Sequence, residues 1–458
     1  MIDRRAVLQA GFSSVLAGGI PSDAIAAGKE AGPESLLETG AALLRAGPLM
    51  NLERAYQVMA EDGLDGLILC HPTNVFHLTG YTDHVALMHD TPSSFVLLAR
   101  DPRQAPGLVM SQFLYYYSFA DTGIDFPLQT FLFTGWDSQL QPGQASPPFT
   151  FGDMGQAPLR RFERRRIEVN SAGLARATLS NGAGVALSRA ARAMGLDRGR
   201  VGHDSMVVPA MCAAEGLNAV LVPADRSLRR VRMIKSAREI SMMRLAAKAN
   251  ADAALAAVKS VRAGANHAEL RAAFASECAR RGATAQLMQI DTILAETSEE
   301  SLQDGSAFAI DCLSHGLHYF GDFGRTVFVG EPTRTMKRAT DAISLGWDAV
   351  REQLRPGLRY SDIKRIGTEA LRKAGYQLDV AFTCHSVGLS HTDEPGRGVS
   401  AGYWVKDDIL LQENMILSVD LPVRQAGMGG SAHLEDLTLI TRTGGEQIND
   451  TAQRTITI

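Results

Sequence analysis

Two aspartates inside an apolar segment constrain most strongly how this chain can fold. The segment AFAIDCLSHGLHYFGDFGRTVF, from Ala307 to Phe328, contains Asp311 and Asp322 eleven residues apart. Ala307–Ile310 has the pattern of a buried strand, and Asp311 follows it directly. A carboxylate buried in this way is costly unless another group compensates its charge. We therefore expect the fold to bring compensating groups to these two side chains.

Three further side chains with charge or an imidazole ring lie beside apolar segments later in the chain. His385 lies in CHSVGLSH, Asp420 ends the apolar segment MILSVD, and Glu435 precedes the apolar segment DLTLIT. Taken alone, each of these residues has an ordinary structural interpretation, since aspartates commonly form turns and histidines commonly lie in cores. With the first two aspartates they form a set of four carboxylates and one imidazole, which suits Mn²⁺, Fe²⁺, Co²⁺ or Zn²⁺. Two divalent cations would balance the four carboxylate charges.

Apolar periodicity predicts an α/β protein with two blocks of helices and strands. In the first block, a helix from Asn51 to Gly63 precedes a buried strand at Leu67–Leu69, and a turn follows at Pro72–Asn74. The second block begins with one long helical pattern from Arg229 to Val261. Its later elements are expected in this order: a helix at 267–281, strands at 287–294 and 307–312, helices at 336–354 and 361–375, and strands at 415–421 and 436–440.

The length and composition indicate a globular protein of more than one domain. The 458 residues favour two or three domains, and 45% of them are hydrophobic and 21% charged. The net charge of −4 gives no basic excess, so a nucleic-acid partner is not expected. We expect a leader at 1–27, a linker at 28–48 that leads into a short helix, a first domain at 49–228 and a second domain at 229–458.

The first residues have the layout of an export signal. Arg4 and Arg5 precede a weakly apolar stretch from Ala6 to Ile20, and Ala24–Ala26 gives a small-residue cleavage site. The stretch is too short for a membrane span. The paired arginines indicate the twin-arginine route, which carries folded proteins, and predict a periplasmic location. Folding before export fits the five cysteines, at 70, 212, 278, 312 and 384, which form no CxxC pair and predict no disulfide framework.

The second block resembles the creatinase, aminopeptidase P and methionine aminopeptidase superfamily, whose catalytic domain has the pita-bread fold. In that superfamily two aspartates of the metal site are followed by an Arg-Thr pair, a histidine before x-x-Gly-Leu, a Glu-Pro and a final Glu-Asp. The segment GLDGLILCHPTNVFHLTGY resembles the amino-terminal domain of the creatinase and prolidase branch. The resemblance therefore implies a creatinase-like amino-terminal α/β domain followed by a pita-bread domain. The matching residues are Asp311, Asp322 with Arg325-Thr326, His385 with Gly388-Leu389, Asp420-Leu421-Pro422, and Glu435-Asp436.

Several positions differ from the pattern of the peptidases in that superfamily. Asp420 stands where those enzymes usually have a glutamate that also relays a proton. His391 lies one position before the usual place of their second histidine, and His433 stands where an arginine is common. The stretch AETSEESLQDG, before the first aspartate, has no histidine, whereas those peptidases carry one there. The metal ligands implied by the resemblance (Asp311, Asp322, His385, Asp420 and Glu435) therefore match more closely than the substrate-binding positions do.

The resemblance implies a metallohydrolase of the Xaa-Pro aminopeptidase or prolidase type with two divalent ions, Mn²⁺ first and Fe²⁺, Co²⁺ or Zn²⁺ as alternatives. Asp420 would relay the proton, and His391 or His433 would donate to the developing oxyanion. The substrate would be a short peptide or another small molecule, and we expect a homodimer without nucleic acid or a membrane span. Two alternatives stay open. One is a small-molecule enzyme similar to creatinase or to the dimethylsulfoniopropionate lyases of this fold, and the other is a peptide-binding protein without catalysis.

Overall fold

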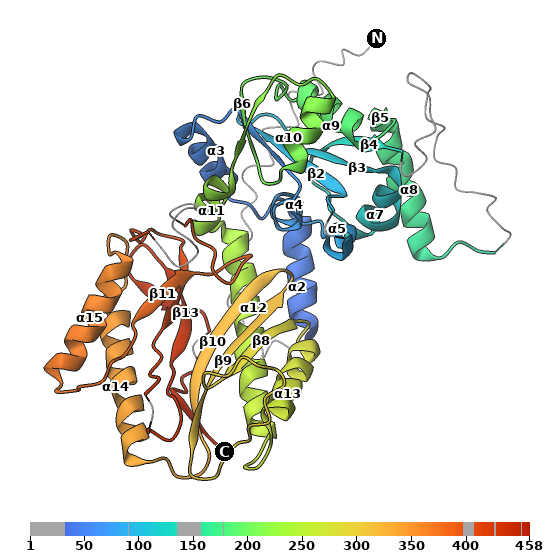
Figure 1. The fold of residues 1–458 in the computed structure, drawn as a ribbon. Helices are drawn as coiled ribbons and strands as arrows, with labels where there is room; N and C mark the ends of the chain where they lie inside the picture. Colours follow the sequence, from blue (N-terminus) through green and yellow to red (C-terminus); the bar gives the residue numbers. More distant parts are fainter. Residues whose placement is uncertain are drawn as a thin grey trace.

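The computed structural model describes residues 33–89, 91–134, 157–176, 178–396, 407–425, 427–449 and 451–458. It contains two α/β units, each built on one large sheet (Figure 1). The export signal expected at 1–27 lies outside the described residues. Within the segment expected as a linker, α2 (Pro33–Arg45) is a helix that packs on α12 (Ala237–Ser260) of the second unit.

The first unit is a seven-stranded sheet with helices on both faces. Its strand order is β5-β4-β3-β2-β1-β6-β7, in which β1–β2 and β2–β3 are antiparallel and the other pairs are parallel. The strands are β1 (Gly66–Leu69), β2 (Ser94–Ala99), β3 (Gly107–Ser111), β4 (Gln129–Phe133), β5 (Thr178–Ser180), β6 (Arg200–His203) and β7 (Val220–Pro223). The helices are α3 (Leu52–Glu61), α4 (Pro72–Thr79), α5 (His84–His89), α6 (Gln112–Leu114), η2 (Tyr115–Phe119), α7 (Ala120–Thr122), α8 (Arg161–Arg176), α9 (Ala183–Ala193) and α10 (Val207–Ala214).

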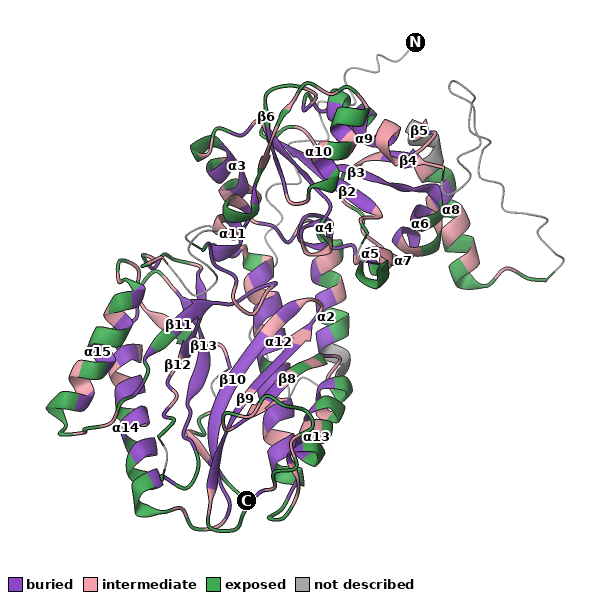
Figure 2. Cartoon of the chain, viewed as in Figure 1, coloured by how far each residue is buried: buried purple, intermediate pink, exposed green. Residues whose placement is uncertain are grey.

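Alternate side chains of the central strand β1 face two separate cores. Ile68 packs in the core that includes α9 and α10, whereas Leu67 and Leu69 pack in the core that includes α3 and α4. Burial on both faces explains why this strand reads as a continuous apolar run, and Figure 2 shows the central strands buried. The turn predicted at Pro72–Asn74 is instead the start of α4, because a proline fits the first helical turn and His71 caps it.

The helical pattern from Arg229 to Val261 is divided into two helices, contrary to the single helix predicted. These are α11 (Asp225–Met233) and α12 (Ala237–Ser260). The Ser236 hydroxyl accepts a hydrogen bond from the Glu239 N–H, and the Glu239 carboxylate accepts one from the Ser236 N–H. This reciprocal capping box starts a new helix at α12 and interrupts the apparent periodicity.

The second unit is an eight-stranded sheet with the path β11-β12-β13-β10-β9-β8, to which β14 adds beside β13 and β15 beside β10. Its strands are β8 (Thr284–Ile290), β9 (Ala307–Gly316), β10 (Tyr319–Phe328), β11 (Thr383–Ser386), β12 (Ile416–Asp420), β13 (Glu435–Ile440), β14 (Gly445–Gln447) and β15 (Thr455–Thr457). Its helices, besides α12, are α13 (His267–Arg280), α14 (Arg334–Arg351) and α15 (Tyr360–Lys373).

Two helix pairs cover the two halves of this sheet. α12 and α13 share a core with β8, β9 and β10, whereas α14 and α15 share a core with β11 and β12 (Figure 1). The two cores meet where β10 pairs with β13, which is the middle of the sheet. The mixed α/β class predicted from the sequence is confirmed.

Two further expectations concern the bilayer and the thiols. Among the residues that the structure describes, no helix is long and apolar enough to cross a membrane. All five cysteines are buried thiols, as expected for a chain without a disulfide framework.

Candidate metal centre

Strand register brings three of the predicted ligands into one row across the second sheet. Asp311 on β9 pairs with Gly324 on β10, Gly324 pairs with Glu435 on β13, and Glu435 pairs with Asp420 on β12. Residues paired across adjacent strands point to the same face of the sheet. The row therefore places three carboxylates on one face, with a glycine between the first two.

The other two predicted ligands lie on the same face, one row away. Asp322 precedes Gly324 by two residues on β10, and His385 follows Thr383, the partner of Asp420, by two residues on β11. Side chains alternate between faces along a strand, so a spacing of two keeps both side chains on the face of the first row. The sheet thus gathers residues that lie far apart in the sequence.

The donor atoms form two groups, one of Asp322, His385 and His391 and the other of Asp311, His433 and Glu435. Within each group, all of the donor atoms lie within 4.8 Å of one another. Glu435 connects the groups, because its Oε1 is 4.0 Å from His385 Nε2 and its Oε2 is 3.6 Å from His433 Nε2.

Asp420 lies beside the second group and is paired with one of its members. Its Oδ1 is 2.6 Å from His433 Nε2, and its Oδ2 accepts a hydrogen bond of 3.1 Å from the Thr383 hydroxyl. Burial acts to raise the pKa of Asp420, but the His433 imidazole outweighs it and leaves the pKa below its usual value. Burial likewise acts to lower the pKa of His433, and the Asp420 carboxylate outweighs it and raises that pKa. The two side chains therefore form an ion pair.

The backbone of neighbouring strands fixes His433. Its N–H donates to the Thr326 hydroxyl at 2.9 Å, and this hydroxyl donates to the His433 carbonyl oxygen at 3.1 Å. Its Nδ1 is 3.3 Å from the Ile310 carbonyl oxygen. A Cβ atom at Gly324 would lie 2.5 Å from the imidazole ring, so a glycine is needed there to leave room for the ring.

Arg325 orders the strand that carries Glu435. Its guanidinium donates at 2.8 Å to Asp436 Oδ1 and at 2.8 Å to the Glu435 carbonyl oxygen. Both members of the Arg325–Asp436 ion pair are 1% exposed, and removal of either charge would leave the other uncompensated in the core. The Arg-Thr pair of the sequence pattern thus has two separate roles, since Arg325 holds β13 and Thr326 holds His433.

Buried oxygens without partners show that the site fits cations. Both carboxylate oxygens of Asp322 and Oδ1 of Asp311 have no hydrogen-bond partner among the described residues. Burial raises the pKa of Asp311 to about 6, although the His433 imidazole opposes this shift. Burial and the Asp322 carboxylate raise the pKa of Glu435 well above its usual value. Carboxylates and imidazoles are donors that divalent transition-metal ions accept, so the residues present fit such ions and lack the counter-charge that these ions would supply.

His391 lies on a loop that the first unit helps to position. Its Nε2 is 3.3 Å from Asp322 Oδ2, and its side chain is 38% exposed. Two residues later, the buried Asp393 accepts a hydrogen bond of 2.7 Å from Arg232 Nε, and Arg232 also donates to Asn74 Oδ1 at 2.8 Å. Asn74 belongs to α4, so a polar chain runs from the first unit to the loop beside the donor groups.

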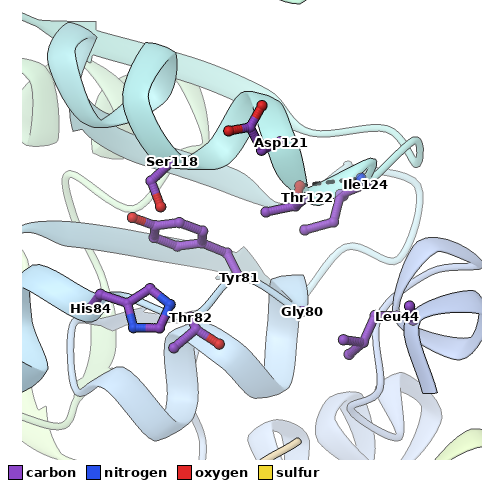
Figure 3. Close-up of a pocket in the computed structure, with 10 residues that line it drawn as sticks. Leu44, Gly80, Tyr81, Thr82, His84, Ser118, Asp121, Thr122 and Ile124 are labelled. Atoms are coloured by element: carbon purple, nitrogen blue, oxygen red, sulfur yellow. Dashed lines mark hydrogen bonds between the residues drawn. The ribbon is translucent and has the colours of Figure 1, made fainter. Parts of the chain in front are cut away.

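A separate pocket of about 280 Å³ lies at the first unit (Figure 3). Tyr81, His84 and Asp121 are among its lining residues, and Asp121 is ion-paired with Arg166. No residue of the two donor groups just described lines this pocket. The pocket is therefore separate from the donor groups.

All seven side chains that the sequence indicated for the site lie together in the structure. Six of them belong to the two donor groups, including His391 and His433, and the seventh, Asp420, is paired with His433. Sequence reasoning missed Gly324, although a glycine inside a strand pattern is a signal for close approach. It also missed Thr383 and Ser418, whose hydroxyl donates to Glu435 Oε1 at 2.6 Å. Nothing in the sequence distinguishes these two hydroxyls from others in strands.

Comparison with known proteins identifies similar chains. The model of metallopeptidase family M24 matches residues 241–442, and the model of the creatinase/prolidase N-terminal domain matches residues 51–123. An Xaa-Pro dipeptidase of Pyrococcus horikoshii is 24% identical over 246 residues, which are 51% of this chain and 67% of that protein. The chain thus matches about two thirds of the length of that relative.

Solved structures show the same fold over nearly their whole length. A dipeptidase from Pyrococcus horikoshii gives a TM-score of 0.63 at 17% identity and covers 89% of this chain and 100% of that one. An Xaa-Pro dipeptidase from Bacillus anthracis also gives 0.63, at 16% identity, and covers 89% of this chain and 99% of that one. The arrangement expected from the sequence, a creatinase-like domain followed by a pita-bread domain, is therefore confirmed.

Proposed function

Because this chain belongs to the creatinase, aminopeptidase P and prolidase superfamily of M24 metallopeptidases, we propose that it is a peptidase of the Xaa-Pro dipeptidase or aminopeptidase type that uses two divalent ions. It is a metallohydrolase, as its superfamily indicates. The bond cleaved would be an amide bond next to proline or a small residue.

The position of Glu435 between the two donor groups carries the proposal for two ions. Its two carboxylate oxygens face different imidazoles, with Oε1 toward His385 and Oε2 toward His433. A carboxylate placed in this way can serve two ions at once. Mn²⁺ is the first candidate, and Fe²⁺, Co²⁺ and Zn²⁺ are alternatives that the same donors accept. Bound divalent ions would supply Lewis acidity toward a carbonyl oxygen and would lower the pKa of a water molecule.

Asp420 is the residue that we propose as the proton carrier. Its side chain is 24% exposed, whereas the side chains of Asp322 and Glu435 are 0% and 3% exposed. His433 lies on Oδ1, whereas Oδ2 accepts only the longer hydrogen bond from the Thr383 hydroxyl, so Oδ2 is the atom that would take a proton from the nucleophile and return it to the leaving nitrogen. His391 is exposed enough to contact a substrate and to donate to its carbonyl oxygen as charge develops there.

One observation supports a second candidate. The His433–Asp420 ion pair occupies positions where the superfamily's peptidases commonly carry an arginine and a glutamate. An altered pair next to the proposed ions favours a changed substrate. The second candidate is therefore an enzyme of the same fold that acts on a small zwitterion, similar to creatinase or to a dimethylsulfoniopropionate lyase.

A substrate panel tests the proposal. The protein would be stripped with a chelator, reloaded with Mn²⁺, and incubated with Xaa-Pro dipeptides, Xaa-Pro-Yaa tripeptides, matched Xaa-Ala peptides and small zwitterions. We expect cleavage of the proline peptides that needs the metal. Turnover of a zwitterion without peptide cleavage would select the second candidate, and turnover of neither by metal-loaded protein would contradict both.

A further inference from the structure

We propose that His433 Nε2 is a direct ligand of the ion held by Asp311 and Glu435. This inference deepens the proposed function and rests on its metal site. The resemblance to the superfamily implies no ligand at this position and suggests a donor to the substrate instead. Geometry in this chain points to a different role for the imidazole.

Burial separates His433 from a substrate. The residue is 3% exposed, whereas the side chain of His391 is 38% exposed. A ring this deep in the sheet has no open face toward a bound peptide. Its Nε2 instead faces carboxylate oxygens, at 2.6 Å from Asp420 Oδ1 and 3.6 Å from Glu435 Oε2. Substrate contact therefore falls to His391, and His433 acts inside the carboxylate cluster.

The second ring nitrogen has the partner that a metal-bound imidazole usually has. Nδ1 is 3.3 Å from the Ile310 carbonyl oxygen, so an Nδ1–H can donate to it. Ligating histidines almost always donate the other ring N–H to a carbonyl or carboxylate, which fixes the tautomer with the lone pair on the ligating nitrogen. Binding of the ion would release to solvent the Nε2 proton that His433 directs at Asp420 in the metal-free protein. Ile310 directly precedes Asp311, so one strand would both orient the imidazole and supply a carboxylate to the same ion.

The surrounding backbone is built around this ring. Thr326 holds the His433 backbone through both its N–H and its carbonyl oxygen, and Gly324 leaves the space that the ring fills. Asp322, one row away, is fully buried and neither of its oxygens has a hydrogen-bond partner. The cluster therefore contains unsatisfied oxygens beside an imidazole whose position is fixed.

A ligand role for His433 gives each donor group its own imidazole, His385 in one and His433 in the other. Imidazole suits Fe²⁺, Co²⁺ and Zn²⁺, whereas donors that are all oxygen suit Mn²⁺. We therefore expect the ion at Asp311 and Glu435 to discriminate against Mn²⁺ more strongly than a site with only carboxylates would.

Co²⁺ binding without any substrate tests this inference. Co²⁺ affinity would be measured by competition with a chromophoric chelator for wild type, His433→Gln and His315→Gln, a control on β9 outside both groups. We expect His433→Gln to weaken one ion by more than the roughly 10–100-fold that loss of an orienting partner causes. The control should bind as wild type does.

Paramagnetic NMR of the Co²⁺ protein distinguishes a ligand from a positioning residue. A ligating imidazole gives a strongly shifted N–H resonance, and we expect His433→Gln to lose one such resonance while Asp420→Asn keeps it. Unchanged resonances in His433→Gln, or an affinity loss within the range of an orienting partner, would overturn the inference and leave the proposed function intact. Wild-type protein that binds no Co²⁺, Mn²⁺ or Zn²⁺ would instead remove the metal site itself.

A third measurement uses wild type alone and does not depend on a variant folding. In a crystal of the Zn²⁺ protein, we expect Nε2 of His433 at the roughly 2.0–2.1 Å typical of zinc–imidazole bonds. A His433 ring that stays on Asp420 without contacting either ion would overturn the inference.

Discussion

Arg232 and Asp393 form a buried ion pair, 2.7 Å between Nε and Oδ1, that joins the segment between the two units to the loop carrying His391. Their side chains are 6% and 0% exposed. Arg232 also reaches Asn74 of the first unit, and the buried Lys235 donates to the Arg232 carbonyl oxygen at 2.5 Å. The pair therefore connects the packing of the two units with the geometry of the donor groups.

Removal of the arginine should destabilise the protein strongly. Arg232→Met would remove the ion-pair partner of the buried Asp393, a loss that typically costs about 3–5 kcal/mol and that the nearby Lys235 and Arg229 would lessen only in part. Urea unfolding of the metal-free protein measures the loss. Arg226→Met is the matched control, because Arg226 pairs with Asp407 at the surface and should change stability little. Equal stability of the two variants would contradict the role given to Arg232.

Loss of a buried carboxylate from the donor groups should remove metal. We expect Asp322→Asn and Glu435→Gln to bind at least one ion fewer than wild type, because neither carboxylate oxygen of the buried Asp322 has a hydrogen-bond partner among the described residues and Glu435 faces both groups. Elemental analysis after dialysis against Mn²⁺ gives the ratio of ion to protein. Asp252→Asn, at an exposed pair with Lys248, is the control. Unchanged metal content in both site variants would contradict the assignment of these ligands.

The contribution of the donor groups to the stability of the metal-free protein should fall as the pH rises from 4 to 7, whereas burial lowers the pKa of His267, His315 and His318 and these three act in the opposite direction. The folded-state pKa of Asp311 is raised from 3.8 to about 6, and the pKa values of Glu435 and His433 are also raised. A group with a raised pKa stabilises the folded state below its unfolded pKa, and that stability is lost as the pH rises through the folded pKa. Asp420 and Asp393 have lowered pKa values, so their contribution is lost only as the pH falls below the usual range of a carboxyl.

Metal should reverse this trend, because the ligands bind ions in their deprotonated forms. Melting temperatures across the pH range, with chelator and with Mn²⁺, measure both slopes. The comparison is made with Glu435→Gln, which removes one of these carboxylates and keeps the buried histidines. A metal-free wild type whose stability changes with pH in the same way as that of Glu435→Gln would be inconsistent with a buried Glu435 carboxylate that lacks counter-charge.

Substitutions of Asp420 separate the two candidate functions. Asp420→Asn should lower turnover by roughly 10²–10⁴-fold, which is the usual contribution of a general acid–base group. Asp420→Glu should keep or raise peptide hydrolysis if the protein is a proline peptidase, and should lower turnover without creating peptidase activity if the site is adapted to a zwitterion. Asp379→Asn, an exposed carboxylate outside the donor groups, is the control. Full activity of Asp420→Asn would move the proton relay to another residue.

Two signals in the sequence indicated which residues meet at the site: charge beside apolar runs, and the resemblance to the superfamily, which implied the ligand set. Asp311, Asp420 and Glu435 each border an apolar run of the sequence, and strand pairing places them in one row, with Asp311 in the interior of β9. The break between α11 and α12 was missed, since helical periodicity continues across it and only the Ser236–Glu239 capping box marks it.

The role of His433 could not be predicted from the sequence. Its position depends on the space at Gly324 and on bonds to Thr326, and both come from the pairing of β10 with the segment that leads into β13. That register joins residues more than 100 positions apart, and local patterns do not specify it. The exposure difference between His391 and His433 is likewise a property of the folded sheet.

Activity as a function of added metal tests whether the protein cleaves proline peptides with two divalent ions. Chelator-treated protein at a concentration well above the dissociation constant would receive Mn²⁺ in steps while hydrolysis of an Xaa-Pro dipeptide is followed. We expect no hydrolysis without metal, an increase as the ion is added, and a plateau at two equivalents per chain. Hydrolysis that is unaffected by chelation, or a fully loaded protein that cleaves no proline peptide, would contradict the proposed function.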